Sequence, residues 1–439
     1  MAIALGSMHT WLRRLTLPGF AIGLLLVAVY AVLRTTGLYE PLSAVWTVVA
    51  TAVTLLSPLA GLTVLAALGP FTEALTDSGQ PTTIPFLLAA LGSGVAMRVL
   101  LTRPLPRPGW PLALAILLLA GTALGVVHSA LAFGSTLGLQ AAQAWVPGIG
   151  GALTVLIAAA WLAWRGELRP LNIVVASIAL AALASLADFA SGGSVFDGPF
   201  GWLLRAYNPN RLAEILPAPN AAAAIFSVGS AVSLAVALFE PRPALRLLAL
   251  GATEVSLLAL SLTFSRAGWL AMGLIVALFT WRWHRRVGLV AIGAIVAVVV
   301  VVVTTGLVRD VPLAADLARV DAWMAAIRMW LADPLLGHGF RSFEWLHAGY
   351  GSPFLDAPHN EWLRLFAEEG IAVGLAGVAF ALAAPVFLLR TPGYVAAGAG
   401  AAAAGLFLIA CFNNPFLYTQ VNVPAFVIIG TGLGVAMRR

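Results

Sequence analysis

The chain has 439 residues, of which 61% are hydrophobic and 10% charged, and its formal net charge is +6. A soluble protein of this composition would have too little polar surface to cover its core, which excludes the soluble classes of enzyme and binding protein. The basic residues, all of them Arg, stand in short connections between apolar stretches. This placement indicates orientation in a membrane and argues against nucleic acid as a partner.

Apolar stretches long enough to cross a membrane recur along the whole chain. They lie at 17–33, 43–69, 84–101, 109–128, 147–164, 170–188, 219–239, 243–263, 266–281, 287–307, 370–389, 393–412 and 419–436. The stretch 43–69 predicts either one kinked helix or two short helices that meet at Pro58. We therefore expect an all-α, polytopic membrane protein with about twelve to fourteen crossings, a single integral membrane domain over 1–439, with 1–7 a remnant ahead of a native Met8.

The distribution of Arg predicts which connections are cytoplasmic. One set carries Arg103, Arg107, Arg165, Arg169, Arg242, Arg246, Arg282, Arg285, Arg286, Arg390, Arg438 and Arg439. The opposite set, at 70–83, 129–146, 189–218, 264–266 and 308–369, is mixed or acidic and is expected outside the cytoplasm. The charges do not settle the orientation of the first 70 residues.

The connection 308–369 is too long and too apolar for an idle loop. Between Leu313 and Leu331 its apolar residues repeat at helical spacing and form one face. We expect an amphipathic helix there, lying along the outer membrane interface and capping a cavity.

Four polar clusters fall on the predicted outer face. They are 210–220, 263–269, 333–343 and the run that begins at Pro358-His359-Asn360-Glu361. Arg266 stands between two apolar stretches with almost no loop, so its guanidinium either reaches the membrane surface as an anchor or lines a protein cavity. Together with Arg211 on the same face, it is a candidate for binding a diphosphate through forked hydrogen bonds.

His359 is the best candidate for proton exchange near neutral pH, because the imidazole titrates there and a carboxylate and an amide follow it. The alternative is a hydrogen-bonded structural histidine. The spacing of His338, His347 and Asp356 matches no metal motif, so we expect no metal and no cofactor. Cys411, the single cysteine, excludes an intramolecular disulfide.

The order of these motifs resembles the O-antigen ligase and O-antigen polymerase superfamily of bacterial membrane glycosyltransferases. The residues that carry the resemblance are Arg211-Leu212, Pro219-Asn220, Ser265-Arg266, Arg319, Trp323, the run 333–339 with Phe343, His359-Asn360, Glu368 and Gly370. They fall within 205–375. Two positions depart from the family pattern: Glu214 stands where a Gly is usual, and Gly370 and Gly374 are farther apart than the family's paired glycines.

The resemblance implies a metal-independent, inverting transfer of a glycan from undecaprenyl diphosphate to an acceptor hydroxyl on the extracytoplasmic face. By this hypothesis Arg211 and Arg266 stabilise the diphosphate, and His359 is the general base or orients the acceptor. Six further residues are expected to bind substrate: Asn220, Arg319, His338, Arg341, Asn360 and Glu361. The expected partners are a lipid-linked oligosaccharide or polysaccharide donor, a lipid, glycan or protein acceptor, and the inner membrane.

Other functions stay open at this point. A repeat-unit polymerase has the same donor and chemistry as a ligase and differs in its acceptor; the short outer connections slightly favour the ligase. A flippase of lipid-linked glycans would place charges near the bilayer midplane, where only Glu254 is evident. A peptidoglycan glycosyltransferase ranks third, because no motif set supports it.

Overall fold

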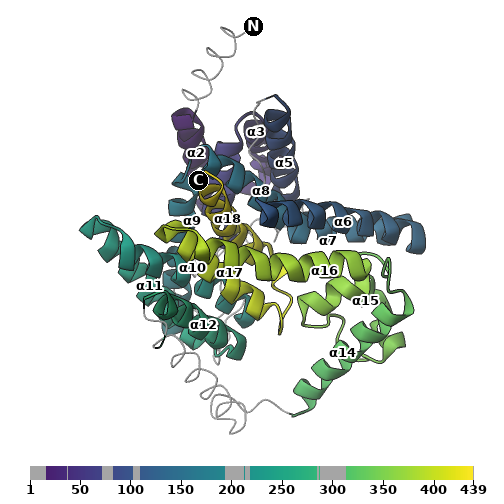
Figure 1. Cartoon of the computed structure of the whole chain (residues 1–439). Helices are drawn as coiled ribbons and strands as arrows, with labels where there is room; N and C mark the ends of the chain where they lie inside the picture. The colour runs from purple at the N-terminus through teal and green to yellow at the C-terminus, as the bar shows by residue number, and fades with distance from the viewer. Residues whose placement is uncertain are drawn as a thin grey trace.

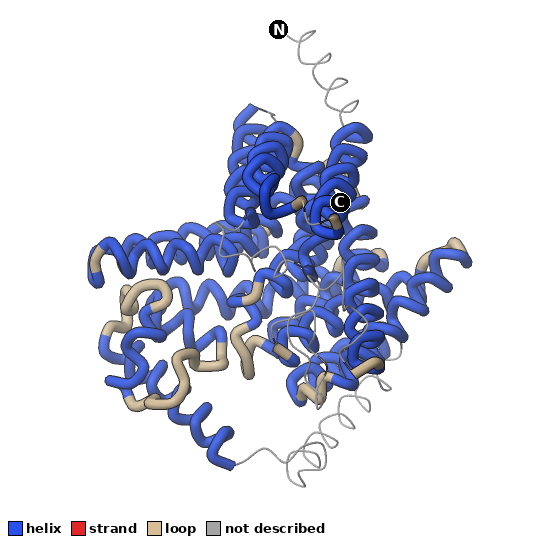
Figure 2. The backbone as a smooth tube through the Cα atoms, turned by 180° about the vertical axis from the view of Figure 1, so that it is seen from behind, coloured by secondary structure: helices blue, strands red, loops and turns tan. Residues whose placement is uncertain are grey.

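Every regular element in the described part of this computed structural model is a helix, which confirms the all-α class (Figures 1 and 2). The structure describes residues 16–36, 38–71, 83–101, 109–192, 212, 218–283, 286 and 313–438. Within these residues, nine helices are long and apolar enough to cross a membrane, and three shorter apolar helices accompany them. The predicted stretch 287–307 lies outside the described residues.

The helices follow the predicted apolar stretches in chain order. They are α2 (Thr16–Thr35), α3 (Tyr39–Leu56), α4 (Pro58–Leu68), α5 (Thr83–Leu101), α6 (Trp110–Phe133), α7 (Ser135–Trp145), η2 (Val146–Gly150), α8 (Gly151–Trp164), α9 (Arg169–Ala190), α10 (Pro219–Phe239), α11 (Pro243–Leu262), α12 (Arg266–Trp283), α14 (Leu313–Ala332), α15 (Ser342–Leu346), η4 (His347–Tyr350), α16 (Glu361–Arg390), α17 (Tyr394–Ile409), η5 (Pro415–Leu417) and α18 (Thr419–Ala436).

The core of the bundle is built around α18, which packs along α8 and α17. Of the 18-residue window in α18, 83% is buried inside the protein, against 22% for α2 at the periphery. Gly430 and Gly434 permit the close approach to α8, since a methyl group at either position would collide with a backbone oxygen of α8, at Leu156 and Ala160 respectively. Small residues four apart are the usual means by which membrane helices pack this closely.

The long stretch 43–69 forms two helices rather than one. Ser57 separates α3 from α4, and its hydroxyl accepts a hydrogen bond from the backbone N–H of Ala60 (3.4 Å). Pro58 occupies the first turn of α4, where its missing N–H costs nothing. The proline therefore starts a new helix instead of kinking an existing one.

The predicted connection at 129–146 is present only as a tight turn at Gly134, and the rest of this stretch is helical. α6 continues to Phe133, the chain turns at Gly134 (φ 88°), and α7 then runs through the π-helical turn η2 into α8. Together they form one apolar span, Ser135–Trp164. Pro147 lacks an N–H, and at the next residue, Gly148, the backbone leaves the helical conformation (φ −82°, ψ −130°), so α7 and α8 meet at a kink.

The predicted amphipathic helix is α14, and it lies beside the first part of α16, away from the main bundle (Figure 1). Its small residues, Ala322, Ala325 and Ala326, are buried against that helix. The predicted apolar face points outward. The exposed residues on and just after α14 are Leu317, Val320, Met324, Leu331, Leu335 and Leu336.

Polar contacts gather at the two opposite ends of α10, and these define two ends of the bundle. At the Arg-rich end, Tyr394 donates a hydrogen bond to Glu240 (2.7 Å) and Arg438 donates one to the carbonyl of Trp164 (2.8 Å). The opposite end, which we call the amide end, gathers Asn220, Asn360, Asn413 and Asn414. α10 runs from one end to the other, and its 21 residues span about 30 Å.

Candidate functional site

The turn between α11 and α12 is the first part of the site at the amide end. Thr263 Oγ1 accepts a hydrogen bond from the backbone N–H of Ser265 (3.2 Å), and Ser265 Oγ accepts one from the N–H of Gly268 (3.3 Å). Ser265 therefore caps α12, whose first residue is Arg266. Phe264 takes a left-handed conformation (φ 49°), which is rare for an aromatic residue and marks a fixed turn.

A side-chain relay connects this turn to the start of α10 and to the connection after α17. Ser265 Oγ donates to Asn220 Oδ1 (2.9 Å), and Asn220 Nδ2 donates to Asn413 Oδ1 (2.9 Å). The buried Leu212 lies against the same place, because its N–H donates to the carbonyl of Leu262 (3.0 Å). The first two predicted clusters thus meet. Arg211 itself lies outside the described residues.

The start of α16 is the second part of the site. Asn360 caps the helix, accepting hydrogen bonds from the N–H groups of Trp362 and Leu363 (3.1 Å each). Immediately before it, half-buried His359 is held at φ 50°. Glu361 makes two hydrogen bonds to the connection after α17. Its N–H donates to the carbonyl of Ala410 (2.8 Å), and its Oε2 accepts from Asn414 Nδ2 (3.1 Å). Asn413 and Asn414 are adjacent, so the relay from Ser265 continues to α16.

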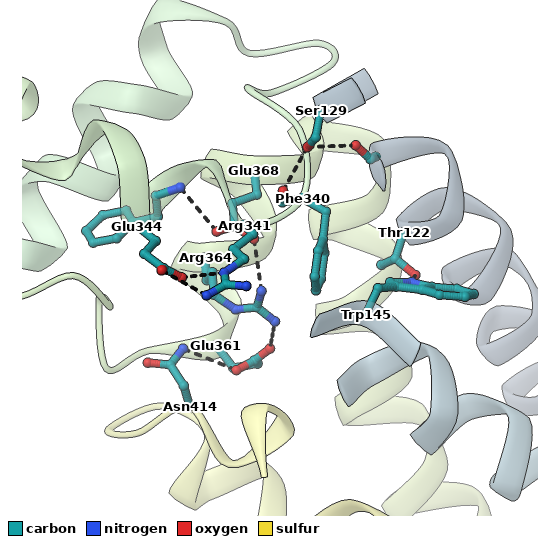
Figure 3. Close-up of polar contacts among 12 residues, drawn as sticks. Thr122, Ser129, Trp145, Phe340, Arg341, Glu344, Glu361, Arg364, Glu368 and Asn414 are labelled. Carbon is teal, nitrogen blue, oxygen red and sulfur yellow. Dashed lines mark hydrogen bonds and ion pairs between the residues drawn. The ribbon is translucent and has the colours of Figure 1, made fainter. Parts of the chain in front are cut away.

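A buried ion triad lies one turn farther along α16 (Figure 3). Arg364 contacts the carboxylate of Glu361 through Nη2 and that of Glu368 through Nη1 (2.9 Å to Oε2). Its guanidinium also faces the ring of Phe340, 5.3 Å from the centroid. None of the three charged side chains is more than 4% exposed. Nε of Arg364 is buried without a hydrogen-bond partner among the described residues, so the two carboxylates satisfy only the terminal nitrogens of this buried charge.

The glycine-rich run 337–343 fills a break in α16. Gly370 interrupts the helix at φ 74° and ψ −176°, a conformation essentially restricted to glycine. The run satisfies the backbone groups that the break leaves open. His338 N–H donates to the carbonyl of Ala367 (3.2 Å), Gly339 N–H to that of Glu368 (2.7 Å), and Ile371 N–H to that of Pro334 (2.9 Å).

The side chains of Ser129 and Glu368 tie this run to its neighbours. Ser129 of α6 donates to the carbonyl of Phe340 (2.7 Å). Glu368 Oε1 accepts from the N–H of Phe343 (3.3 Å), so the triad reaches the run as well (Figure 3). All four predicted clusters are therefore connected through described residues at one end of the bundle.

His338 and Arg341 are held by protein groups inside this arrangement. His338 Nε2 lies 2.9 Å from the carbonyl of Met329 in α14. Arg341 pairs with Glu344 and donates through Nη1 to the carbonyl of Gln140 in α7 (3.3 Å). Arg341 is also left-handed (φ 69°), so each of the three described non-glycine residues with positive φ lies at this end.

The electrostatic environment of His359 comes from two nearby charges and from burial. Burial lowers the pKa of the imidazole, the positive charge of Arg319 lowers it further, and Asp356 opposes both by raising it. His359 is therefore neutral at neutral pH and able to accept a proton. Arg319 belongs to α14, so this helix contributes directly to the surroundings of the histidine.

The sequence did not single out Asn413, Asn414 or Arg364. The two amides had one signal, the run Asn413-Asn414-Pro415 between two apolar stretches, which predicts a turn with polar side chains at a membrane boundary. Arg364 stands three residues after Glu361 and four before Glu368, the spacing of ion pairs on one helix face. No group of three or more His, Cys, Asp or Glu side chains that could hold a metal ion occurs among the described residues.

Comparison with known proteins finds a family model that matches part of the chain. Residues 252–379 match the model of the O-antigen ligase family. The matched region contains Arg266, Arg319 and His359, and it confirms the resemblance drawn from the motifs. No curated protein matches the chain. The match and the apolar helices together indicate a multi-pass membrane protein of the glycosyltransferase type represented by O-antigen ligases and polymerases.

Proposed function

We propose that the chain transfers a glycan from undecaprenyl diphosphate to an acceptor hydroxyl, at the amide end and on the extracytoplasmic face of the bacterial inner membrane. The relay from Ser265 to Glu361 is the observation that carries this proposal. It joins the turn before Arg266 to the helix start after His359. Arg242 and Arg438, from the connections predicted as cytoplasmic, lie at the opposite end and support this orientation, since Arg-rich connections stay in the cytoplasm.

The reaction that fits these residues is a single displacement. The acceptor oxygen attacks the anomeric carbon, and the bond from that carbon to the diphosphate oxygen breaks. The electron pair leaves with the lipid diphosphate, which Arg211 and Arg266 stabilise as its charge grows. The hydroxyl proton passes to neutral His359. One displacement inverts the anomeric carbon, and no step requires a metal.

Substrate contacts are proposed for the residues around this centre. Arg319 acts on the charged groups of the substrate from α14, close to His359. Asn220, His338, Arg341 and Asn360 act from positions that protein contacts already fix. Glu361 is completely buried, so its role is to hold the site rather than to touch substrate.

We further propose that α14 lies in the outer interface of the membrane. Its exposed Leu317, Val320 and Leu331 form an apolar face, and the alanine face opposite packs on α16. A helix of this kind is stable with its apolar side among lipid headgroups and acyl chains.

The acceptor distinguishes a ligase from a polymerase. The connections at the amide end that separate α11 from α12 and α17 from α18 are short. They leave little room for a second lipid-linked repeat unit, which favours the ligase. A flippase is less well supported, because Glu254, the one charge predicted near the midplane, is exposed on α11 and does not line the interior.

The test is transfer by purified protein in liposomes, with a synthetic lipid-linked oligosaccharide and separate lipid, glycan and protein acceptors. Arg211→Ala, Arg266→Ala and His359→Ala are each expected to lower transfer at least about 100-fold. Arg242→Ala, at the Arg-rich end, is the matched control and should transfer normally. Transfer at wild-type rate by all three variants contradicts the proposal. Movement of the donor across the bilayer without transfer identifies a flippase.

A further inference from the structure

Arg364 has no part in the chemistry proposed above, yet it is among the most completely enclosed charges of the described structure. Both of its terminal nitrogens contact protein carboxylates, and its face lies on Phe340. An arginine that bound the diphosphate would need its terminal nitrogens exposed to the substrate. Arg364 is instead occupied on all these sides by the protein.

We infer that Arg364 is a positioning residue, whose bridge between Glu361 and Glu368 fixes the place of His359 relative to Arg266. This inference rests on the proposed function, in which those two residues act on the same substrate. Nothing in the family match assigns a role to Arg364.

Local contacts hold the backbone around His359. His359 has a positive φ, a conformation that a non-glycine residue keeps only when the surrounding structure holds it. Asn360 holds the next residue by capping the helix, and Glu361 is anchored to Ala410, Asn414 and Arg364. If Arg364 is lost, the Glu361 carboxylate keeps only its bond to Asn414.

A series of side-chain contacts connects Glu361 to the turn before Arg266. Glu361 binds Asn414, the neighbouring Asn413 binds Asn220, and Asn220 binds Ser265 at the cap of α12. Through Glu368, the same guanidinium also holds the N–H of Phe343 in the glycine-rich run. A single side chain thus joins the helix that follows His359 to two other parts of the site.

The stability of the folded protein does not account for the triad. An apolar substitute for a buried ion pair is often as stable as the pair itself, so stability alone does not explain why the triad exists. Charged hydrogen bonds do specify one geometry, and catalysis is sensitive to displacements of about 1 Å, which can cost about 100-fold in rate. Geometry is therefore the function that accounts for the triad.

The experiment compares wild-type protein with Arg364→Met combined with Glu361→Gln. The double variant leaves an acceptor for Asn414 and avoids one unpaired buried carboxylate. We expect kcat to fall about 10- to 100-fold, as for other residues that orient a reacting group, with the KM for donor within about twofold. Arg364→Lys, which keeps the charge, should recover part of the rate. Arg242→Met, which breaks an Arg–Glu pair at the opposite end, should leave both parameters unchanged.

A second readout is independent of transfer. In nanodiscs, ¹³C-labelled histidine gives an NMR titration of His359, assigned by its loss in His359→Gln. We expect the pKa of His359 in the double variant to rise toward the ordinary histidine value, because the displaced imidazole loses part of its burial and its proximity to Arg319, the two causes that lower the pKa.

Three results overturn the inference. The first is an unchanged His359 titration in a folded double variant. The second is a raised donor KM with unchanged kcat, which would make Arg364 a substrate ligand. The third is an equal loss of rate in Arg242→Met, which would make the effect general destabilisation. An inactive wild-type protein whose His359 titration still responds to Arg364 would instead remove the proposed function and leave the positioning role.

Discussion

Near each end of α10, a buried carboxylate lies beside an arginine, but the two surroundings differ. At the Arg-rich end Glu240 pairs with Arg242, whose side chain is 70% exposed, and with Tyr394, on ordinary backbone. At the amide end Glu361 and Glu368 share Arg364, which is buried, and left-handed residues lie on the segments around it. The arginine at the Arg-rich end is therefore exposed, whereas the arginine at the amide end is enclosed by protein.

The largest expected difference between the ends is in stability. Glu361→Ala leaves Arg364 buried with one partner fewer, a change that typically costs about 3–5 kcal/mol. Arg242→Ala removes a partner whose side chain is 70% exposed and leaves Glu240 with its hydrogen bond from Tyr394, so the melting temperature should fall by less than in Glu361→Ala. Thermal unfolding of the two variants in the same detergent measures this. Equal losses would mean that the two ends do not differ as described.

A second comparison concerns backbone conformation. Gly370→Ala forces a side chain into a glycine-only conformation and against the carbonyl of Leu335, at a cost of about 1–3 kcal/mol for the backbone alone. Gly393 precedes α17 at the Arg-rich end and also has a positive φ, 104°. Gly393→Ala should lower stability only, whereas Gly370→Ala should also lower transfer per folded molecule. Both are measured by unfolding and by transfer assays normalised to folded protein.

The electrostatics of His359 give a smaller, directional effect. As the general base, His359 must be neutral, so activity falls on the acid side where the imidazole gains its proton. Arg319→Gln removes a charge that lowers this pKa, and the acid limb should move to higher pH. Asp356→Asn removes the opposing charge and should move it to lower pH. The pH profile of kcat/KM measures both, and shifts of the same sign would contradict the assignment.

The smallest effect is expected at Glu240. The hydrogen bonds from Arg242 and Tyr394 lower its pKa to about 2 from an ordinary value of 4.5. A lowered carboxyl pKa stabilises the folded state above the unfolded pKa, and this stabilisation is lost as the pH falls toward 2. The difference in melting temperature between wild type and Glu240→Gln should therefore be constant near neutral pH and shrink in acid, with transfer unchanged. A difference that grows in acid would show that the pairing is weaker than the geometry indicates.

The helices were the most predictable part of this molecule, because a lipid-spanning segment must be long, apolar and hydrogen-bonded within itself. The predicted secondary structure was wrong where a polar stretch was interpreted as a loop. Residues 129–146 contain Ser135, Gln140 and Gln143, yet they are helical since nothing before Pro147 breaks the pattern except Gly134. The face of α14 was predicted correctly as apolar, but its alanines, not its leucines, are what α16 covers.

The candidate site was predictable in its residue types and not in its connections. Arginine, histidine and amide side chains at one predicted face indicated where to look. The relay depends on Asn413 and Asn414, which are more than 40 residues from the nearest predicted motif in sequence. Contacts of this range come from how the helices pack, which the periodicity of a single sequence does not contain.

The break at Gly370 has a consequence for how the protein is made. As α16 enters the bilayer, its open carbonyls at Ala367 and Glu368 would meet lipid unless other donors were present. Those donors belong to residues 338 and 339, which leave the ribosome before α16 does. Residues 334–343 are therefore synthesised before the break that they satisfy. A circular permutant in which 334–343 follow α18 should insert poorly into the membrane, although its folded structure could form the same contacts.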